Sequence, residues 1–221
     1  MKQPIIFCDF DGTITETDNI ISLMKKFAPS EWLEVKDQIL SQDISIQEGV
    51  GRLFGLLSSN LKEDLIGFLK ETVMIREGFS KFVQYTRDEE IPLYIVSGGI
   101  DFFVYPLLEG LIEREYIYCN GSNFSLETIQ ILWPNECDEN CSNGCGCCKP
   151  SIMNKLAGPD EHIIVIGDSI TDFQAAKMAH TVFARDFLIE KMDELEKPYH
   201  SFETFYDVIE TLKQKKSEVD V

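Results

Sequence analysis

Basic residues are scarce in this chain of 221 residues, which has 20 Lys and Arg against 38 Asp and Glu. The formal net charge of −18 argues against nucleic-acid binding, because a phosphate backbone attracts basic faces, and an anionic membrane surface would repel the chain as well. With 44% hydrophobic and 26% charged residues, the composition is that of an ordinary globular protein and not of a disordered one. The length fits one large α/β domain or a domain with one sizeable insertion.

Long apolar runs and a secretion signal are missing too. The first apolar stretch, Ile5 to Cys8, is interrupted by Asp9 and is too short to span a membrane or to serve as a signal peptide. We therefore expect a cytoplasmic protein that binds neither membranes nor nucleic acids. The three histidines are scattered and match no catalytic triad or metal-binding spacing. No feature of the sequence indicates an oligomeric state.

The chain alternates between patterns typical of strands and of helices. Buried strands are predicted over residues 4–10, 92–96, 116–119, 163–166 and 181–184. Helices are predicted after Gly99, from Lys149 and over residues 171–178, and two more close the chain. This alternation predicts a mostly parallel sheet covered by helices on both faces. The polar tail, residues 213–221, is expected to fray.

Residues 17–75 follow the first strand directly and show helical spacing without a strand. Ligands of parallel α/β sheets bind at the carboxyl ends of the strands, so we expect this block to cover the site as a cap of three or four helices. Residues 1–16 and 76–221 are then expected to form the core domain. The predicted helix caps are Asp18, Ser45 (in a capping box with Glu48) and Asn60.

Two acids, Asp9 and Asp11, stand two residues apart where the first strand ends. In one crevice their charges would repel and raise a pKa, and Mg²⁺ would relieve this because it takes carboxylates together with water and substrate phosphate. Gly12 lets the backbone come close to a ligand. Taken alone, the same residues are explained equally well as an ordinary turn after a strand.

A second pair of acids, Asp168 and Asp172, follows a later strand, and their spacing places both on one side of the next helix. A capped helix start would explain this pair by itself. Ser97-Gly98-Gly99 offers a hydroxyl and accessible amides that could hold a phosphate, and Lys149 adds a cation. A Ser-Gly-Gly loop and a lone lysine are each weak signals in isolation.

In this order the motifs resemble the four motifs of the haloacid-dehalogenase-like (HAD) phosphohydrolases. The resemblance covers residues 4 to about 183 and implies a Rossmann-like three-layer parallel sheet with an inserted helical cap, as in the phosphoserine-phosphatase-like branch. It implies a Mg²⁺-dependent phosphatase in which Asp9 is the nucleophile and Asp11 the general acid and base. It also implies metal ligands at Asp9, Asp11, Asp168 and Asp172, and phosphoryl contacts at Ser97, Gly98 and Lys149.

Longer strings resemble one branch of this family, which acts on a small metabolite. They lie at residues 46–52, 97–110, 141–150 and 183–186. The branch implies hydrolysis of an enolised ketone phosphate with a methylthioether tail, in methionine salvage. Arg52 matches the position at which phosphoserine phosphatases hold a substrate carboxylate, so phosphoserine or another small phosphate ester is the alternative substrate. A solvated helix arginine is the plainer interpretation of Arg52. Cap aromatic residues such as Trp32 and Phe54 are expected to be buried.

Five of the seven cysteines fall within residues 137–148: Cys137, Cys141, Cys145, Cys147 and Cys148. Three interpretations stay open. A structural Zn²⁺ takes four thiolates, although the spacing differs from the usual two C-x2-C pairs. A disulfide conflicts with the reducing cytosol. The third is a loop of reduced thiols. Cys8, beside Asp9, is expected to be a buried strand residue.

Other classes of protein explain less of the sequence. A receiver domain of a signalling pair also uses strand-end acids with a Thr and a Lys, but its motif order differs and it lacks the helical insertion. A binding module that kept the fold would be expected to lose Asp9 or Asp11, and both are present. A zinc-dependent interaction module would leave the strand-end motifs unexplained. We therefore expect an enzyme.

Overall fold

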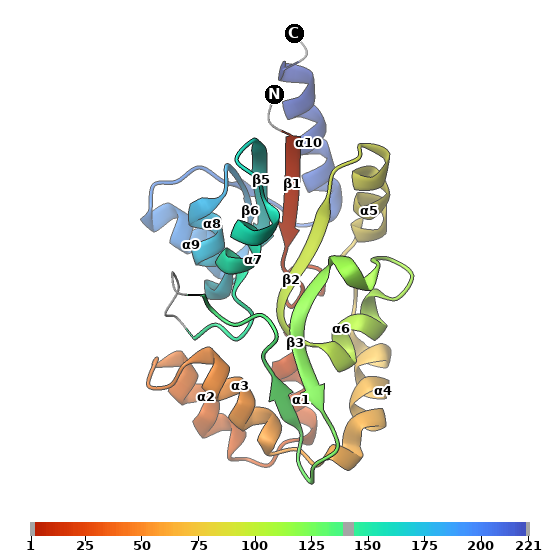
Figure 1. Cartoon of the computed structure of the whole chain (residues 1–221), viewed down its shortest axis with the longest axis vertical. Helices are drawn as coiled ribbons and strands as arrows, with labels where there is room; N and C mark the ends of the chain where they lie inside the picture. Colours follow the sequence, from red (N-terminus) through yellow and green to blue (C-terminus); the bar gives the residue numbers. More distant parts are fainter. Residues whose placement is uncertain (1–2, 139–143, 220–221) are drawn as a thin grey trace.

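A seven-stranded sheet forms the centre of the molecule in the computed structural model, which describes residues 3–138 and 144–219 (Figure 1). The strand order is β4-β3-β2-β1-β5-β6-β7, and every neighbouring pair is parallel except β3 and β4. The strands are β1 (Gln3–Cys8), β2 (Leu93–Ile100), β3 (Ile117–Asn123), β4 (Gln130–Leu132), β5 (Glu161–Gly167), β6 (Thr181–Ala184) and β7 (His200–Ser201).

Helices cover both faces of this sheet, which confirms the predicted three-layer α/β fold. Along β1, Ile6 and Cys8 pack against one set of helices: α5 (Phe79–Asp88), α6 (Asp101–Leu108) and α10 (Phe205–Val219). Ile5 and Phe7 point to the other face, under α7 (Lys149–Leu156), α8 (Phe173–Met178) and α9 (Asp186–Glu194). Burial on both faces explains why the strand is apolar at successive positions.

Four further helices lie between β1 and α5 in the sequence, at the carboxyl end of β1 in Figure 1. They are α1 (Asn19–Phe27), α2 (Trp32–Leu40), α3 (Ile46–Gly55) and α4 (Lys62–Thr72). Asp18 caps α1 as predicted, because its Oδ1 accepts a hydrogen bond from the Ile21 amide. Ser45 likewise accepts a hydrogen bond from the Glu48 amide at the start of α3.

The predicted cap at Asn60 is wrong. Residues Ser59–Leu61 form a 3₁₀ turn, whose cap is Ser58, and α4 begins only at Lys62. The Asn60 amide is itself the donor to Ser58 Oγ, at 3.4 Å. Helix α2 and helix α5 were not located individually by the sequence pattern, although α5 carries four buried side chains.

The C-terminal tail also differs from the prediction, because α10 continues to Val219. Its last turns pack on α5: Lys213 Nζ lies 5.6 Å from the ring centre of Tyr85, and Lys216 pairs with Glu89 at 2.5 Å. These contacts stabilise the last turns of α10, because an isolated helical segment with so polar a composition would be only marginally stable in water.

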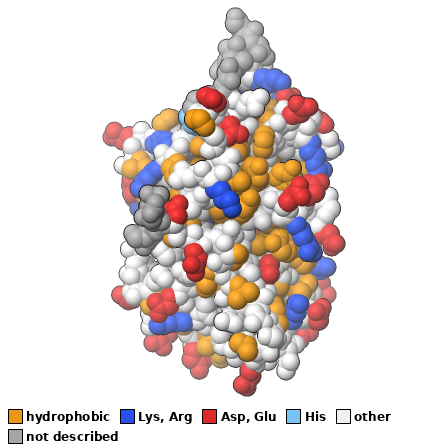
Figure 2. Space-filling view, in the orientation of Figure 1, with side chains coloured by type: hydrophobic (Ala, Val, Ile, Leu, Met, Phe, Trp, Pro, Cys, Tyr) orange, Lys and Arg blue, Asp and Glu red, His pale blue; other side chains and the backbone are white. Residues whose placement is uncertain are grey.

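On the face of the molecule seen in Figure 2, the Asp and Glu side chains are scattered and not gathered in one patch. Among the described residues, none of the helices is both long and apolar enough to cross a membrane.

Candidate functional site

The predicted site residues come from three neighbouring strands, β2, β1 and β5, and from the start of α7. Asp9 follows β1, Asp168 follows β5, and Lys149 is the first residue of α7. Because β1 lies between β2 and β5 in parallel register, their carboxyl ends meet at one edge of the sheet. The structure therefore brings these residues together although the sequence separates them widely.

A buried lysine holds two of the carboxylates. Lys149 Nζ lies 2.7 Å from Asp9 Oδ1 and 2.5 Å from Asp172 Oδ1, and all three residues are at most 5% exposed. Burial alone would lower the pKa of Lys149, but the charges of Asp172 and Asp9 raise it above its ordinary value. Lys149 is therefore a permanent cation within the site.

Asp172 has both carboxylate oxygens engaged. Its Oδ1 accepts from Lys149, and its Oδ2 accepts from the backbone amides of Asp168 at 3.1 Å and Ser169 at 3.0 Å. The two amide donors belong to the loop after β5, so Asp172 holds the backbone of that loop in position. These contacts favour a positioning role for Asp172 over direct metal ligation.

Asp168 completes a group of carboxylates with Asp9 and Asp172, in which one oxygen from each lies within 4.8 Å of the others. Thr13 Oγ1 donates to Asp168 Oδ1 at 2.8 Å. Burial, followed by the negative charge of Asp172, raises the pKa of Asp168 to about 7, and the same two causes raise the pKa of Asp9. Crowded carboxylates with hard oxygen donors fit a divalent cation such as Mg²⁺.

Asp11 lies apart from this group, under the start of α1. Its Oδ1 accepts from the Asn19 backbone amide at 3.1 Å and from Asn19 Nδ2 at 2.6 Å. Burial, then the charges of Asp18 and Asp9, raises the pKa of Asp11 well above its ordinary range. A raised pKa favours the protonated carboxyl group, which is the form that a general acid needs.

Ser97 and Gly98 lie within β2 and not in a loop after it, because the strand continues to Ile100 past an irregularity in its pairing with β3. Ser97 is fully buried, and its Oγ accepts from the Gly99 amide at 2.9 Å. A side chain at Gly99 would collide with Asp11 Oδ2 and Ser97 Oγ, so these two oxygens flank the same point of the backbone.

Two polar residues at the site were missed by the sequence analysis. Asn120 on β3 donates from Nδ2 to the Gly98 carbonyl at 2.8 Å, and Asn19 supports Asp11 as described above. Both are at most 1% exposed. A buried asparagine has a structural cost unless it is hydrogen-bonded, but its burial is a property of the fold and gives no local sequence signal.

Arg76 is the third residue that the sequence analysis missed. It is buried, and its Nε donates to the Thr13 carbonyl at 2.7 Å while Nη2 donates to the Gly12 carbonyl at 2.8 Å. The guanidinium therefore holds the turn that follows Asp11. In the sequence nothing distinguishes Arg76 from a surface arginine.

Arg52 is not brought into this site. Its side chain is 50% exposed on α3, and its partners are Glu48 at 2.5 Å and Gln38 at 3.2 Å. The contacts match the plainer interpretation of a solvated helix arginine. By contrast, Trp32 and Phe54 are buried in the hydrophobic core, as predicted.

The cysteines separate into groups. Cys8 is a fully buried strand residue, as predicted. The thiols of Cys137, Cys145 and Cys148 lie within 4.8 Å of one another, whereas Cys147 Sγ turns toward the Tyr118 carbonyl at 3.7 Å. Cys141 lies outside the described residues.

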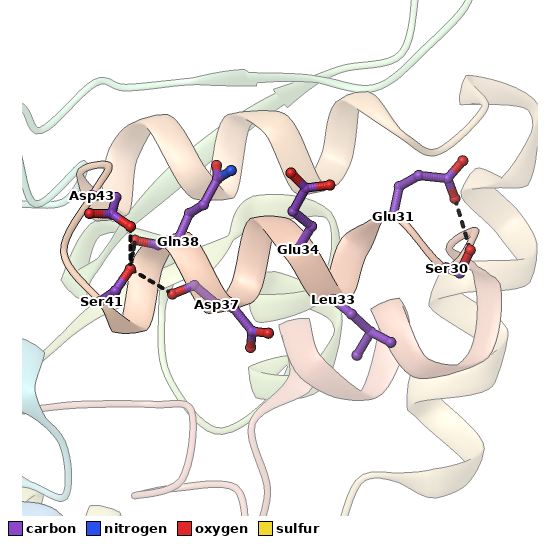
Figure 3. A pocket seen from close by; sticks show the side chains of 8 residues that line it. All are labelled: Ser30, Glu31, Leu33, Glu34, Asp37, Gln38, Ser41 and Asp43. Carbon is purple, nitrogen blue, oxygen red and sulfur yellow. Dashed lines mark hydrogen bonds between the residues drawn. The ribbon is translucent and has the colours of Figure 1, made fainter.

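A separate pocket of about 680 Å³ runs along α2 (Figure 3). Its eight lining residues include four acids and neither Lys nor Arg, so it suits a phosphate dianion poorly. None of the strand-end residues lines it. The acids are Glu31, Glu34, Asp37 and Asp43.

Comparisons with known proteins agree with this geometry. A model of the haloacid dehalogenase-like hydrolase family matches residues 6–177. The chain is 62% identical over 213 residues to the 2-hydroxy-3-keto-5-methylthiopentenyl-1-phosphate phosphatase of Geobacillus kaustophilus, covering 96% of this chain and 97% of that protein. The protein of the same name from Geobacillus thermodenitrificans is 59% identical with equal coverage.

Solved structures show the same fold. A phosphoserine phosphatase with an analogue of its phospho-aspartyl intermediate superposes with a TM-score of 0.72 at 17% identity, covering 96% of this chain and 99% of that one. A phosphoserine phosphohydrolase-like protein from Francisella tularensis gives a TM-score of 0.68 at 19% identity, with 95% and 99% covered. The fold, the four strand-end motifs and the family match together show that this chain belongs to the haloacid dehalogenase-like hydrolases.

Proposed function

We propose that this protein is a Mg²⁺-dependent phosphatase that hydrolyses 2-hydroxy-3-keto-5-methylthiopentenyl-1-phosphate in methionine salvage. The observation that carries the chemistry is the buried cluster at the strand ends, in which Lys149 contacts Asp9 and Asp172 beside Asp168. The names of the relatives at 62% and 59% identity support the substrate.

In the first step, a carboxylate oxygen of Asp9 attacks phosphorus and the bond from phosphorus to the leaving oxygen breaks. Asp11 gives its proton to that oxygen, which leaves as a neutral hydroxyl compound. The raised pKa of Asp11 supports this role, because the acid must still hold its proton when the substrate binds. The product of the step is an aspartyl-phosphate.

In the second step, the now ionised Asp11 takes a proton from water, and the resulting hydroxide attacks the phosphorus of the aspartyl-phosphate. Inorganic phosphate leaves and Asp9 is regenerated as a carboxylate. Ser97, the amides near Gly98 and the Lys149 ammonium are the groups we assign to the phosphoryl oxygens. Their fixed positions would stabilise charge that develops in the transition state.

The residues that would hold Mg²⁺ are Asp9, Asp168 and the main-chain carbonyl of Asp11, with Asp172 as a positioning residue through its contacts to the loop. When bound, the cation would offset the negative charge of the carboxylates and of the phosphoryl group. The raised pKa values of Asp9 and Asp168 support this assignment, because they reflect burial first and then the negative charge of Asp172, and a bound cation would favour the ionised carboxylates against both.

We further propose that residues 17–75 are a cap and that residues 1–16 and 76–221 are the core domain. The two connections run side by side: Thr15 and Ile75 form an antiparallel bridge, flanked by backbone hydrogen bonds from Glu16 to Met74 and from Arg76 to Ile14. A pair of adjacent connections is a suitable hinge for a cap.

An apolar boundary between cap and core favours the methylthioether substrate over phosphoserine. Phe54 of α3 packs edge-on against Phe102 of α6, with ring centres 5.9 Å apart. Arg52, the candidate for binding a carboxylate, is engaged by Glu48 and Gln38 instead. A thioether tail needs an apolar surface, whereas the phosphoserine carboxylate needs a cation.

The test is a substrate panel of small phosphate monoesters with and without Mg²⁺. The enol phosphate should be the best substrate, and chelation should abolish its hydrolysis. Much faster hydrolysis of phosphoserine would overturn the substrate assignment.

A variant tests the acid–base role of Asp11. Asp11→Asn should lower turnover by about 10²–10⁴-fold, with Asp64→Asn on the exposed side of α4 as the matched control. Near-normal turnover of Asp11→Asn would overturn the acid–base role.

A further inference from the structure

A second group of candidate metal ligands lies outside the strand-end site. The Sγ atoms of Cys137, Cys145 and Cys148 all lie within 4.8 Å of one another. A disulfide would join two of them and leave the third outside the bond, so the convergence of three thiols points to a different purpose. Soft thiolate ligands select soft or borderline cations such as Zn²⁺ over Mg²⁺.

A tight glycine turn lies between two of the three thiols. Cys145 and Cys148 are separated by two residues, and Gly146 between them has a φ of +77°, the left-handed region that favours glycine. A side chain at Gly146 would collide with the Trp133 ring, so this turn is closely packed. The C-x2-C spacing is one half of the usual zinc-binding pattern, and Cys137 supplies the third thiol from the other end of the loop.

The structure also separates these thiols from two other cysteines that it describes, Cys147 and Cys119. Cys147, next in sequence to Cys148, is 3% exposed and faces the Tyr118 carbonyl. Cys119 is buried in β3. Neither belongs to the group of three.

We infer that Cys137, Cys145 and Cys148 bind a Zn²⁺ ion through their thiolates. Tetrahedral zinc with Zn–S bonds of about 2.3 Å would hold the sulfurs about 3.8 Å apart, which is compatible with observed separations of at most 4.8 Å. The inference assigns three ligands of the tetrahedron and leaves the fourth unassigned. Ser151 Oγ lies 3.0 Å from Cys148 Sγ and would support that ligand by a hydrogen bond.

The position of this group gives the ion a role in the geometry of the strand-end site. Cys148 directly precedes Lys149, and its amide donates to the Asn135 carbonyl at 2.8 Å. On the other side, the Gly144 carbonyl accepts from the Gln47 amide of α3 at 3.0 Å. Zinc would tie the two ends of the loop together and so fix both the start of α7 and a contact with the cap. Because α7 begins with Lys149, loss of zinc should also lower phosphatase activity. This expected loss of activity is the one part of the inference that rests on the proposed function.

The first test is the metal content of the full-length protein, purified under reducing conditions without chelators from a zinc-supplemented culture. We expect stoichiometric zinc by mass spectrometry of the acid-digested protein. Replacement of zinc by Co²⁺ should produce a thiolate-to-metal charge-transfer band in the near ultraviolet. Absence of zinc together with absence of that band would overturn the inference, and so would an intact mass that shows two of the three cysteines oxidised to a disulfide.

Variants locate the ligands. Cys137→Ser and Cys145→Ser, both at partly exposed positions, should lose the metal, whereas Cys147→Ser and Cys119→Ser should retain it. Ser151→Ala removes this hydrogen bond to Cys148 and the one that Ser151 Oγ accepts from the Asp138 amide at 3.3 Å, and it should weaken zinc affinity about 10–100-fold. Equal zinc content in all of these variants would contradict the assignment. Zinc-loaded protein without Mg²⁺-dependent phosphatase activity would instead contradict the proposed function and leave the zinc site standing.

Discussion

The ammonium group of Lys149 lies 2.7 Å from Oδ1 of Asp9, and both residues are 5% exposed. Lys149 lowers the pKa of the proposed nucleophile, but burial and the charge of Asp172 leave that pKa raised overall. In the proposed mechanism the same ammonium group contacts the phosphoryl oxygens. Lys149 would therefore act on both the nucleophile and the phosphate.

Removal of this cation should be severe. Lys149→Met leaves Asp9 and Asp172 buried without their shared partner, so we expect kcat to fall by about 10²–10³-fold. Lys155→Met, at an exposed position of the same helix, is the control and should retain activity. Steady-state kinetics on both variants makes the measurement, and equal activities would remove Lys149 from the site.

Arg76 should be sensitive even to a conservative change. A lysine at position 76 has one ammonium group in place of the planar fork that reaches the carbonyls of Thr13 and Gly12. Each buried carbonyl left without a donor costs about 1–3 kcal/mol. We expect Arg76→Lys to lower both the free energy of unfolding and kcat, with little change in KM.

Urea unfolding and steady-state kinetics would measure the two effects of Arg76→Lys. Arg87→Lys is the control, because Arg87 lies on α5 and makes an exposed ion pair with Glu113. If both variants behave like the unmodified protein, the turn after Asp11 does not depend on the guanidinium.

Gly12 and Gly110 form a matched pair of positions. Both have positive φ, +83° and +78°, so alanine should cost about 1–2 kcal/mol of backbone strain at either one. At Gly12 the new methyl group would also collide with the Asp168 carboxylate, whereas at Gly110 no described residue lies within 4 Å of it. Gly12→Ala should therefore weaken Mg²⁺ activation, and Gly110→Ala should not.

Measuring activity as a function of Mg²⁺ concentration distinguishes the backbone strain that both alanine variants share from the collision with Asp168 that only Gly12→Ala causes. A similar loss of stability with a different Mg²⁺ dependence supports the placement of Asp168 beside Gly12. Identical Mg²⁺ curves would show that Asp168 is not involved in the response to the cation.

The stabilising effect of Mg²⁺ should depend on pH. Without metal, the raised pKa of Asp168, about 7, means that its stabilising contribution is complete below the unfolded-state pKa of about 3.9 and is lost as pH rises through about 7. Cation binding needs the ionised form, so Mg²⁺ restores stability where the protons have left. At a concentration of 100 times Kd the gain is about 2.7 kcal/mol.

Thermal melts with and without Mg²⁺ test this dependence. The increase in Tm should be large near about pH 8 and small near about pH 5.5. Asp168→Asn should abolish it, and Asp160→Asn, at an exposed position before β5, should not. An increase in Tm that is independent of pH would place Mg²⁺ elsewhere.

The strand ends and the three-layer fold could be predicted from the sequence, because the patterns that indicate them are local. Asp9, Asp11 and Asp168 each follow an apolar strand, and a parallel sheet brings such ends together without further information. The start of α7 was also predictable, since Pro150 follows Lys149. The helix caps were less secure: Asp18 was identified, but Ser58 and Asn60 are two residues apart and equally suited by type.

Residues whose roles depend on distant partners were not predictable. Arg76 reaches a turn more than 60 residues earlier in the chain, and Asn120 reaches Gly98 on the neighbouring strand. The sequence also could not divide the cysteines, because Cys147 and Cys148 are adjacent and differ only in the direction of their side chains. The partners of Arg76 and Asn120 and the directions of the cysteine side chains are set by tertiary packing, which the local sequence does not reveal.

Three backbone hydrogen bonds join the proposed cap to the proposed core, in addition to the paired connections at Thr15 and Ile75. They run from Ser59 to Glu127, from Ile129 to Leu57, and from Gln47 to Gly144, at 3.0, 3.1 and 3.0 Å. A rotation of the proposed cap about its hinge would have to break them. Each cycle of opening would then cost several backbone hydrogen bonds, so the rate of opening could limit turnover.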